Sequence, residues 1–207
     1  MHLEAHAKKR PNAPAIRYLN DEFSYDQINA WVNRYSNYFL AQDIQPGDTI
    51  GINVENRTEC LVAVLAVVKV GAIAAMINTS QRGEVLLHSI NLVKPKMMLI
   101  GEEQLDNMST VQESLTIELK TQLYYLKDEG AIACPNDYQN MDVVSKGQSE
   151  DNPGTTEKIQ MKQPCFYIFT SGTTGLPKAS VMSHYRWHKS MAGMGLISMR
   201  LRPADVM

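Results

Sequence analysis

Residues 165–178 read Cys-Phe-Tyr-Ile-Phe-Thr-Ser-Gly-Thr-Thr-Gly-Leu-Pro-Lys, and their side chains change from apolar to polar at Thr170. Residues 165–169 are all apolar and follow Pro164, which is typical of a short strand buried on both faces. Proline is tolerated where a strand begins, because its missing N–H costs little there. Hydroxyl residues, glycines and a lysine follow without a break. The stretch therefore predicts a buried strand that leads into a polar, glycine-rich loop.

This loop combines hydrogen-bond donors, backbone freedom and one positive charge. Its hydroxyl and glycine residues are Thr170, Ser171, Gly172, Thr173, Thr174 and Gly175. Together with Lys178 they suit the acceptor oxygens and the negative charge of a polyphosphate. The loop differs from the common P-loop, because Leu176 and Pro177 separate the last glycine from the lysine. On composition alone, an ordinary solvent-exposed turn is the alternative.

Residues 167–178 resemble the signature loop of the adenylate-forming superfamily, which includes acyl-CoA synthetases, luciferases and peptide-synthetase adenylation domains. The match is uninterrupted from Thr170 to Lys178. Many members have Gly after the lysine, whereas this chain has Ala179. Residues 179–184 are similar to the long- and very-long-chain acyl-CoA synthetase branch, whose animal members are called fatty acid transport proteins. Further likeness to that branch lies within residues 47–101, at Gly47-Asp48, Glu55-Asn56-Arg57 and 69–78.

The resemblance implies an acid–thiol ligase that uses ATP, Mg²⁺ and CoA. A long- or very-long-chain fatty acid would react with ATP to give an acyl-adenylate, and CoA would then accept the acyl group as a thioester. A free carboxylate needs such activation, because its oxygen is a poor leaving group. Donors around the phosphates, together with Mg²⁺, must neutralise the charge that develops during this step.

The resemblance also implies roles for individual residues. Lys178 is the candidate catalytic residue, on the distal phosphates, and His184 would lie near the nucleotide or acyl pocket. The residues that would cradle the triphosphate are Thr170, Ser171, Gly172, Thr173, Thr174 and Gly175. His184 and His188 are four residues apart on an expected helix, but no third ligand is evident, so we expect a polar helix face and no metal site.

Strands are expected to alternate with helices through residues 1–126. The expected strands are a hairpin within 15–25 and the segments 49–54, 72–77, 96–100 and 122–126. The expected helices begin at the capping boxes Ser24/Gln27, Asn56/Glu59 and Ser109/Gln112, and at Ser80. This rhythm predicts an α/β fold, a largely parallel sheet with flanking helices. In such sheets ligands bind beyond the carboxyl ends of the strands, where the 170–178 loop falls.

The resemblance makes residues 1–207 a part of the large N-terminal AMP-binding domain of an adenylate-forming enzyme. Within it, 1–126 is the βα region and 127–163 an irregular loop, mobile at 145–158, where apolar residues are almost absent. Residues 164–207 hold the phosphate-loop strand, a brief second strand at 180–183 and a helix capped by Ser183. We expect the C-terminal domain to be missing, so that this fragment alone is inactive as a ligase.

Composition excludes several other classes of protein. The formal net charge is −2, so no basic field points to nucleic acid. The longest apolar run, Cys60–Val68, is far shorter than the ~20 residues that cross a bilayer, which leaves only a peripheral membrane contact open. The chain has 3 cysteines with no close pair and no signal peptide, so we expect a cytoplasmic protein.

Two alternatives remain beside the fatty acyl-CoA ligase. One is a non-catalytic, truncated chain that binds a nucleotide or a partner protein. The other is an adenylating enzyme with an aryl or amino acid substrate, against which the Ala179 pattern argues. For the fatty acyl-CoA ligase and for the aryl or amino acid adenylating enzyme alike, we expect most residues that set substrate specificity to lie beyond this fragment.

Overall fold

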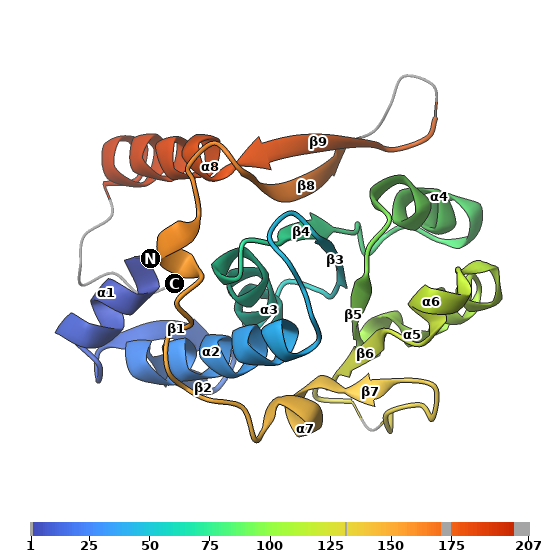
Figure 1. The fold of residues 1–207 in the computed structure, drawn as a ribbon, viewed down its shortest axis with the longest axis horizontal. Helices are drawn as coiled ribbons and strands as arrows, with labels where there is room; N and C mark the ends of the chain where they lie inside the picture. Colours follow the sequence, from blue (N-terminus) through green and yellow to red (C-terminus); the bar gives the residue numbers. More distant parts are fainter. Residues whose placement is uncertain (1, 131, 171–174, 201–207) are drawn as a thin grey trace.

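The computed structural model describes residues 2–130, 132–170 and 175–200, which build a seven-stranded sheet and a separate hairpin (Figure 1). The strands of the large sheet are β3 (Thr49–Asn53), β4 (Ile73–Met76), β5 (Met97–Gly101), β6 (Leu123–Leu126), β7 (Gln139–Asn140), β8 (Pro164–Thr170) and β9 (Lys178–Ser183). Their order is β7-β6-β5-β3-β4-β8-β9. All neighbours pair in parallel except β8 and β9, which are antiparallel. The prediction of an α/β fold with a largely parallel sheet is confirmed.

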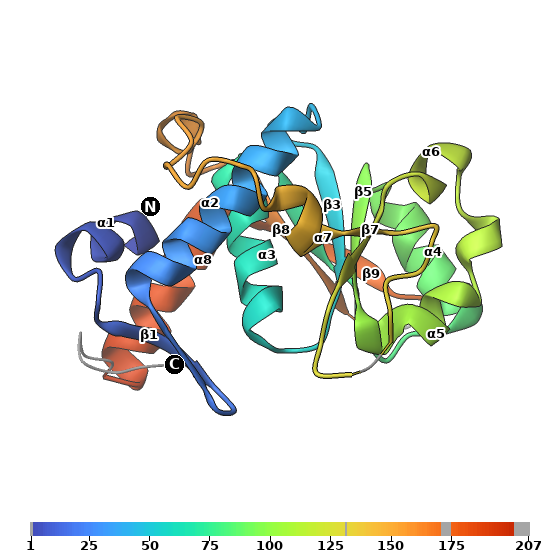
Figure 2. The same cartoon turned by 90° about the horizontal axis from the view of Figure 1, so that it is seen from below.

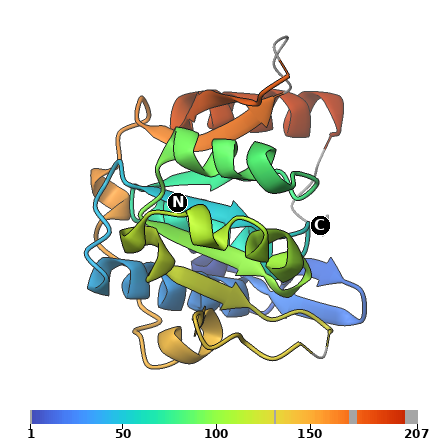
Figure 3. The same cartoon turned by 90° about the vertical axis from the view of Figure 1, so that its right-hand side faces the viewer.

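Helices cover both faces of this sheet, which gives three layers (Figure 2). On one face lie α2 (Tyr25–Ala41), α3 (Thr58–Lys69) and α8 (His184–Met191). On the other face lie α4 (Gly83–Val93), α5 (Leu105–Ser109) and α6 (Ile117–Lys120), which stand in front of the strands in Figure 3. Successive strand residues point to opposite faces, so Leu99 joins the core under α2 and α3, whereas Met98 and Ile100 join the core under α4 to α6.

The amino-terminal part packs along α2. It comprises α1 (His2–Lys9) and the hairpin of β1 (Pro14–Tyr18) and β2 (Asp21–Ser24). The predicted hairpin is confirmed, and so is the capping box, because Ser24 and Gln27 each accept the other's backbone N–H. The apolar face of α2 is buried at Ile28, Val32, Tyr35 and Phe39, and half-buried at Trp31.

Two predicted helix starts are wrong. The N-cap of α3 is Arg57 with no side-chain cap, rather than Asn56 paired with Glu59. Helix α3 ends at a glycine: Gly71 has a φ of +84° just after the C-cap Val70. Helix α4 begins at Gly83 rather than at Ser80.

Between β5 and β6 the chain folds into short turns instead of one helix. The turns are η1 (Glu102–Gln104), α5, η2 (Gln112–Ser114) and α6. The predicted Ser109/Gln112 capping box is wrong, because Ser109 ends α5 and the side chain of Thr116 caps α6. Leu115 and Leu119 are nevertheless buried, each from a different turn. Burial of the apolar residues here does not require a single helix.

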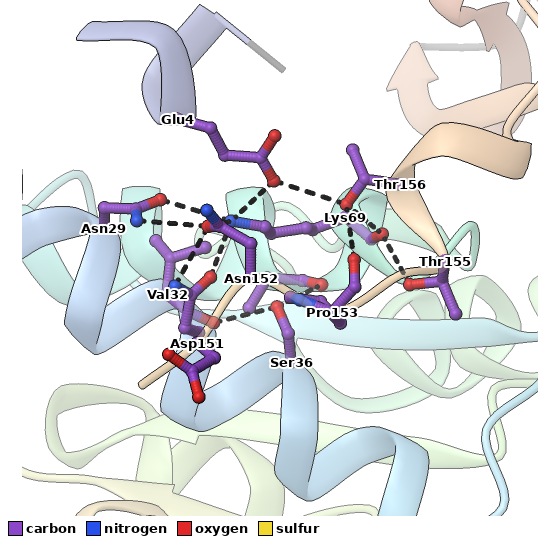
Figure 4. A network of polar contacts seen from close by, with 12 residues as sticks. Glu4, Asn29, Val32, Ser36, Lys69, Asp151, Asn152, Pro153, Thr155 and Thr156 are labelled. Carbon is purple, nitrogen blue, oxygen red and sulfur yellow. Dashed lines mark hydrogen bonds and ion pairs between the residues drawn. The ribbon is translucent and has the colours of Figure 1, made fainter. Parts of the chain in front are cut away.

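Most of residues 127–163 are irregular, apart from β7, α7 (Met141–Ser145) and η3 (Thr156–Lys158). The part expected to be a mobile surface loop is tied to the core by a buried polar network (Figure 4). Lys69 is fully buried and donates to Asn33 Oδ1 at 2.6 Å and Asn152 Oδ1 at 2.9 Å. It also forms an ion pair with Glu4 at 2.9 Å. The network thereby joins α1, α2 and α3 to the segment that leads into β8.

The last described elements are a strand hairpin and a helix. In the hairpin Pro164 lies opposite Ser183, and Thr170 opposite Lys178. The side chain of Ser183 accepts the Arg186 N–H, which confirms the predicted cap of α8. The π-helix η4 (Ala192–Ser198) follows α8 directly. Strand β8 is less buried than predicted, because only Cys165 and Phe166 are fully buried in it.

Candidate functional site

The predicted phosphate loop connects β8 to β9 at the carboxyl edge of the parallel sheet. Strand β8 runs parallel to β4, with Ile168 beside Met76, so its carboxyl end Thr170 lies at the same edge as the ends of β3, β4, β5 and β6. This edge is the usual ligand-binding edge of open α/β sheets. The antiparallel β9 begins at that edge with Lys178.

The two ends of the loop are brought together by strand pairing. Thr170 is the pairing partner of Lys178 across the hairpin, and both residues are exposed. Gly175 has a φ of +87°, and a Cβ added there would meet nothing within 4 Å. Ser171, Gly172, Thr173 and Thr174 lie outside the described residues. Strand pairing therefore places a hydroxyl residue and a lysine opposite each other at the mouth of the loop, both exposed to solvent.

Pro177 is the point at which the outgoing arm of the loop rests on the protein. It is buried, whereas Leu176 and Lys178 on either side are exposed. The Nε2 atom of His88, on α4, lies 3.2 Å from the carbonyl oxygen of Pro177. Beside this contact an open groove of about 580 Å³ is lined by His88, Leu92, Val93, Tyr167, Leu176, Pro177, Lys178 and Ala179. No local sequence pattern predicts the histidine contact, because residues 88 and 177 are far apart in the chain.

A buried arginine ties together other strand ends at the same edge. The Arg57 guanidinium donates to the carbonyl oxygens of Leu126 at 3.1 Å and Lys127 at 2.7 Å. It forms an ion pair with Glu59 at 2.8 Å and lies 3.5 Å from Glu103. Burial works against its charge, but these carboxylates outweigh burial and raise the pKa of Arg57. Every one of these contacts is internal to the fold, so we interpret Arg57 as structural.

His184 lies at the other end of the hairpin from the loop. It follows Ser183, which pairs with Pro164 at the amino end of β8, and its backbone N–H donates to Gln163. Strand β9 has six residues, and a strand of that length is about 20 Å long. Burial lowers the pKa of His184, and its buried Nε2 has no hydrogen-bond partner within the described ranges. The structure therefore does not bring His184 together with Thr170, Gly175 and Lys178.

Three other features bear on the class of site. Among the described residues, no group of three or more His, Cys, Asp or Glu side chains could hold a metal ion. No helix in that part of the chain is long and apolar enough to cross a bilayer. Burial raises the pKa of the Cys60 thiol to about 11 and that of Cys165 to about 12, so both thiols stay protonated at neutral pH. We interpret these two cysteines as packing residues.

Comparison with protein families decides the family of the chain. The model of the AMP-binding enzyme family matches residues 3–207, which include the whole hairpin and its loop. The chain belongs to the AMP-binding enzyme family. The family resemblance seen in residues 167–178 is confirmed.

The relatives of this AMP-binding chain include fatty-acid ligases and transport proteins. It is 37% identical over 192 residues to the medium/long-chain-fatty-acid–CoA ligase FadD6 of Mycobacterium tuberculosis, covering 93% of this chain and 30% of the relative. It is 29% identical to the long-chain fatty acid transport protein 6 of Homo sapiens, covering 86% of this chain and 28% of that protein. The chain thus spans about 30% of the length of these curated relatives.

Solved structures of adenylate-forming enzymes share the fold. The anthranilate CoA ligase AuaEII in complex with anthranoyl-AMP superposes with a TM-score of 0.83 at 20% identity, over 94% of this chain and 36% of that one. A fatty acyl CoA synthetase of Mycobacterium tuberculosis gives a TM-score of 0.77 at 19% identity, over 93% of this chain and 36% of that one. At this level of identity the likeness concerns the fold alone.

Proposed function

We propose that these residues form the phosphate-binding part of an ATP-dependent ligase that joins a long- or very-long-chain fatty acid to CoA. The observation that carries the proposal is the loop at the carboxyl edge of the sheet, where Lys178 and Thr170 stand opposite each other and exposed. Family membership and the fatty-acid ligases among the relatives support the acid–thiol ligase class. The free cysteines fit the reducing cytoplasm that we propose as its location.

In this proposal the loop holds the triphosphate of ATP during attack by the fatty carboxylate. The carboxylate oxygen bonds to the α-phosphorus, pyrophosphate leaves, and the thiol of CoA later displaces AMP from the acyl-adenylate. Lys178 would neutralise charge on the departing phosphates, and Thr170 with Ser171, Thr173 and Thr174 would donate hydroxyl hydrogen bonds. Gly172 and Gly175 would let backbone N–H groups approach the phosphate oxygens, since glycine adds no side chain.

Mg²⁺ would enter this site as part of the nucleotide complex. The described residues hold no carboxylate cluster at the loop, and Mg²⁺ commonly keeps several waters and binds through substrate phosphates. The metal would supply charge neutralisation at the phosphates. His184 stands about a strand length from the loop, so we do not count it among the phosphate contacts, and its place near the nucleotide or acyl pocket stays a prediction.

Titration of the chain with ATP tests the proposal. We expect Lys178→Ala to weaken ATP binding by about tenfold or more, because a hydrogen bond to a charged group contributes about 1.5–3 kcal/mol. Lys162→Ala, which removes an exposed lysine before β8, is the matched control and should bind as the unmodified chain does. Equal affinity in all three proteins would contradict a phosphate role for Lys178. Absence of ATP binding by the unmodified chain would instead favour a non-catalytic partner-binding protein.

A further inference from the structure

The outgoing arm of the phosphate loop, up to Pro177, lies beyond the last strand pair of the hairpin, which joins Thr170 to Lys178. The incoming arm is fixed because β8 pairs with β4 on one side and with β9 on the other. On the outgoing arm, Pro177 has no N–H to donate, and the backbone of Gly175, at a positive φ, is not restricted by a side chain. Its carbonyl oxygen is the group of Pro177 that can form a hydrogen bond.

His88 supplies the partner for that carbonyl oxygen. It lies on α4, whose buried side chains Leu86, Ile90 and Val93 fix the helix on the sheet, and α4 also packs against β9. The His88 Nε2 atom is 3.2 Å from the Pro177 oxygen. A carbonyl oxygen only accepts, so Nε2 must carry the hydrogen, and the contact joins a rigid helix to the residue just before Lys178.

We propose that His88 is a positioning residue for the phosphate loop: it holds the Pro177 carbonyl and thereby sets the orientation of Lys178 toward the distal phosphates. The planar peptide unit from Pro177 to Lys178 contains this carbonyl group, so fixing the oxygen also fixes the direction of the Lys178 N–H. The choice of a phosphate ligand rests on the proposed function. The geometry of the anchor rests only on the contact between His88 of α4 and Pro177.

Glutamine and asparagine at position 88 give a matched pair of variants. The Nε2 of glutamine is as many bonds from Cα as the Nε2 of histidine, whereas the amide nitrogen of asparagine is one bond closer. His88→Gln should therefore keep the contact, and His88→Asn and His88→Ala should lose it. His2→Ala, at an exposed histidine on α1, is the control for loss of a histidine elsewhere.

Two measurements on the chain test the proposal. Calorimetric titration with inorganic tripolyphosphate should show binding weakened by about three- to tenfold in His88→Ala and His88→Asn, and nearly unchanged in His88→Gln. Hydrogen exchange at the amides of Lys178 and Ala179 should accelerate in the same two variants only. The melting temperature should stay similar in all variants, because His88 is only half-buried.

The outcomes separate the anchor from the proposed function. Unchanged exchange at Lys178 and Ala179 in His88→Ala would overturn the positioning role, whatever binds. Loss of affinity in His88→Gln as well, with normal exchange, would mean that the imidazole contacts the ligand directly, and would also overturn it. If the unmodified chain binds neither tripolyphosphate nor ATP, the proposed function fails, while the exchange data still decide whether His88 anchors the loop.

Discussion

Gly175 shows how a single residue shapes the candidate site. Its φ of +87° lies in the left-handed region, where residues with a Cβ are strained. The space around it is open, so a side chain would meet no neighbour within 4 Å. Any cost of substitution is therefore conformational rather than steric, and falls on the bend between the loop and Pro177.

At this scale we predict that Gly175→Ala lowers the free energy of unfolding by about 1 kcal/mol, because alanine pays the full left-handed penalty. Gly175→Asn should cost less, since asparagine tolerates this region better. Urea unfolding of both variants measures the difference. An alanine variant as stable as the original chain would show that the bend does not need glycine.

Polar side chains from several elements meet at Lys69. Lys69 is the last residue of α3, and its side chain is fully buried. Its ammonium group donates hydrogen bonds to Asn29 and Asn33 of α2 and to Asn152 of the irregular segment. The carbonyl oxygen of Lys69 also accepts the hydroxyl of Thr155 at 3.2 Å. The network therefore fixes the path of the chain into β8, at the opposite edge of the sheet from the loop.

We predict that Lys69→Met destabilises the protein by about 3 kcal/mol or more, because it removes the ammonium donor of the buried Asn29 and Asn33 amide oxygens and breaks the ion pair with Glu4. Lys96→Met is the matched control: it removes an ion pair with Asp48 that is half open to solvent, and should cost about 0–1 kcal/mol. Denaturant unfolding of both variants gives the comparison. Equal costs would mean that burial of the network contributes nothing.

The same network gives the stability an acid-dependent component. Burial alone would raise the pKa of Glu4, but the hydrogen bonds and charges of Lys69 and of the amino terminus together lower that pKa below its ordinary value of 4.5. The stabilisation is thus fully present above about pH 4.5 and is lost as the pH falls through the lowered pKa. Melting temperatures of the original chain should drop more steeply below pH 4.5 than those of Glu4→Gln. Parallel curves would rule out this linkage.

At the scale of the whole molecule, the order of the strands sets which parts are most protected. β3 lies between β4 and β5, with helices on both faces, and all five of its residues are buried. β9 is at the edge of the described sheet, and Lys178, Ser180 and Val181 within it are exposed. The loop of the candidate site thus lies between β8 and the less protected edge strand β9.

We predict that native-state hydrogen exchange follows this order. Amides of β3 and β4 should exchange only through global unfolding, whereas those of β9 should exchange through local opening of smaller free energy. Exchange measured residue by residue at increasing urea distinguishes the two routes. Protection of β9 equal to that of β3 would contradict the edge position.

Local signals predicted much of this structure, and they failed where distant residues take over. The Ser24/Gln27 box and the Ser183 cap involve neighbours within one turn, so the sequence alone was sufficient. The Asn56/Glu59 box was wrong because Arg57, pulled into the interior by Leu126, Lys127 and nearby carboxylates, takes the N-cap position. The helix expected to begin at the Ser109/Gln112 box was wrong because the chain forms separate short turns there, which bury Leu115 and Leu119.

Local sequence was enough to predict the strand–loop–strand hairpin, the alternating α/β pattern and the hydroxyl, glycine and lysine content of the loop, because these depend on residues close together in the chain. Tertiary packing was needed to bring His88 to Pro177, and to bring Asn29, Asn33 and Asn152 to Lys69. Those contacts join segments far apart in the chain, and no local preference encodes them. They exist because packing on both faces of one sheet brings the segments together.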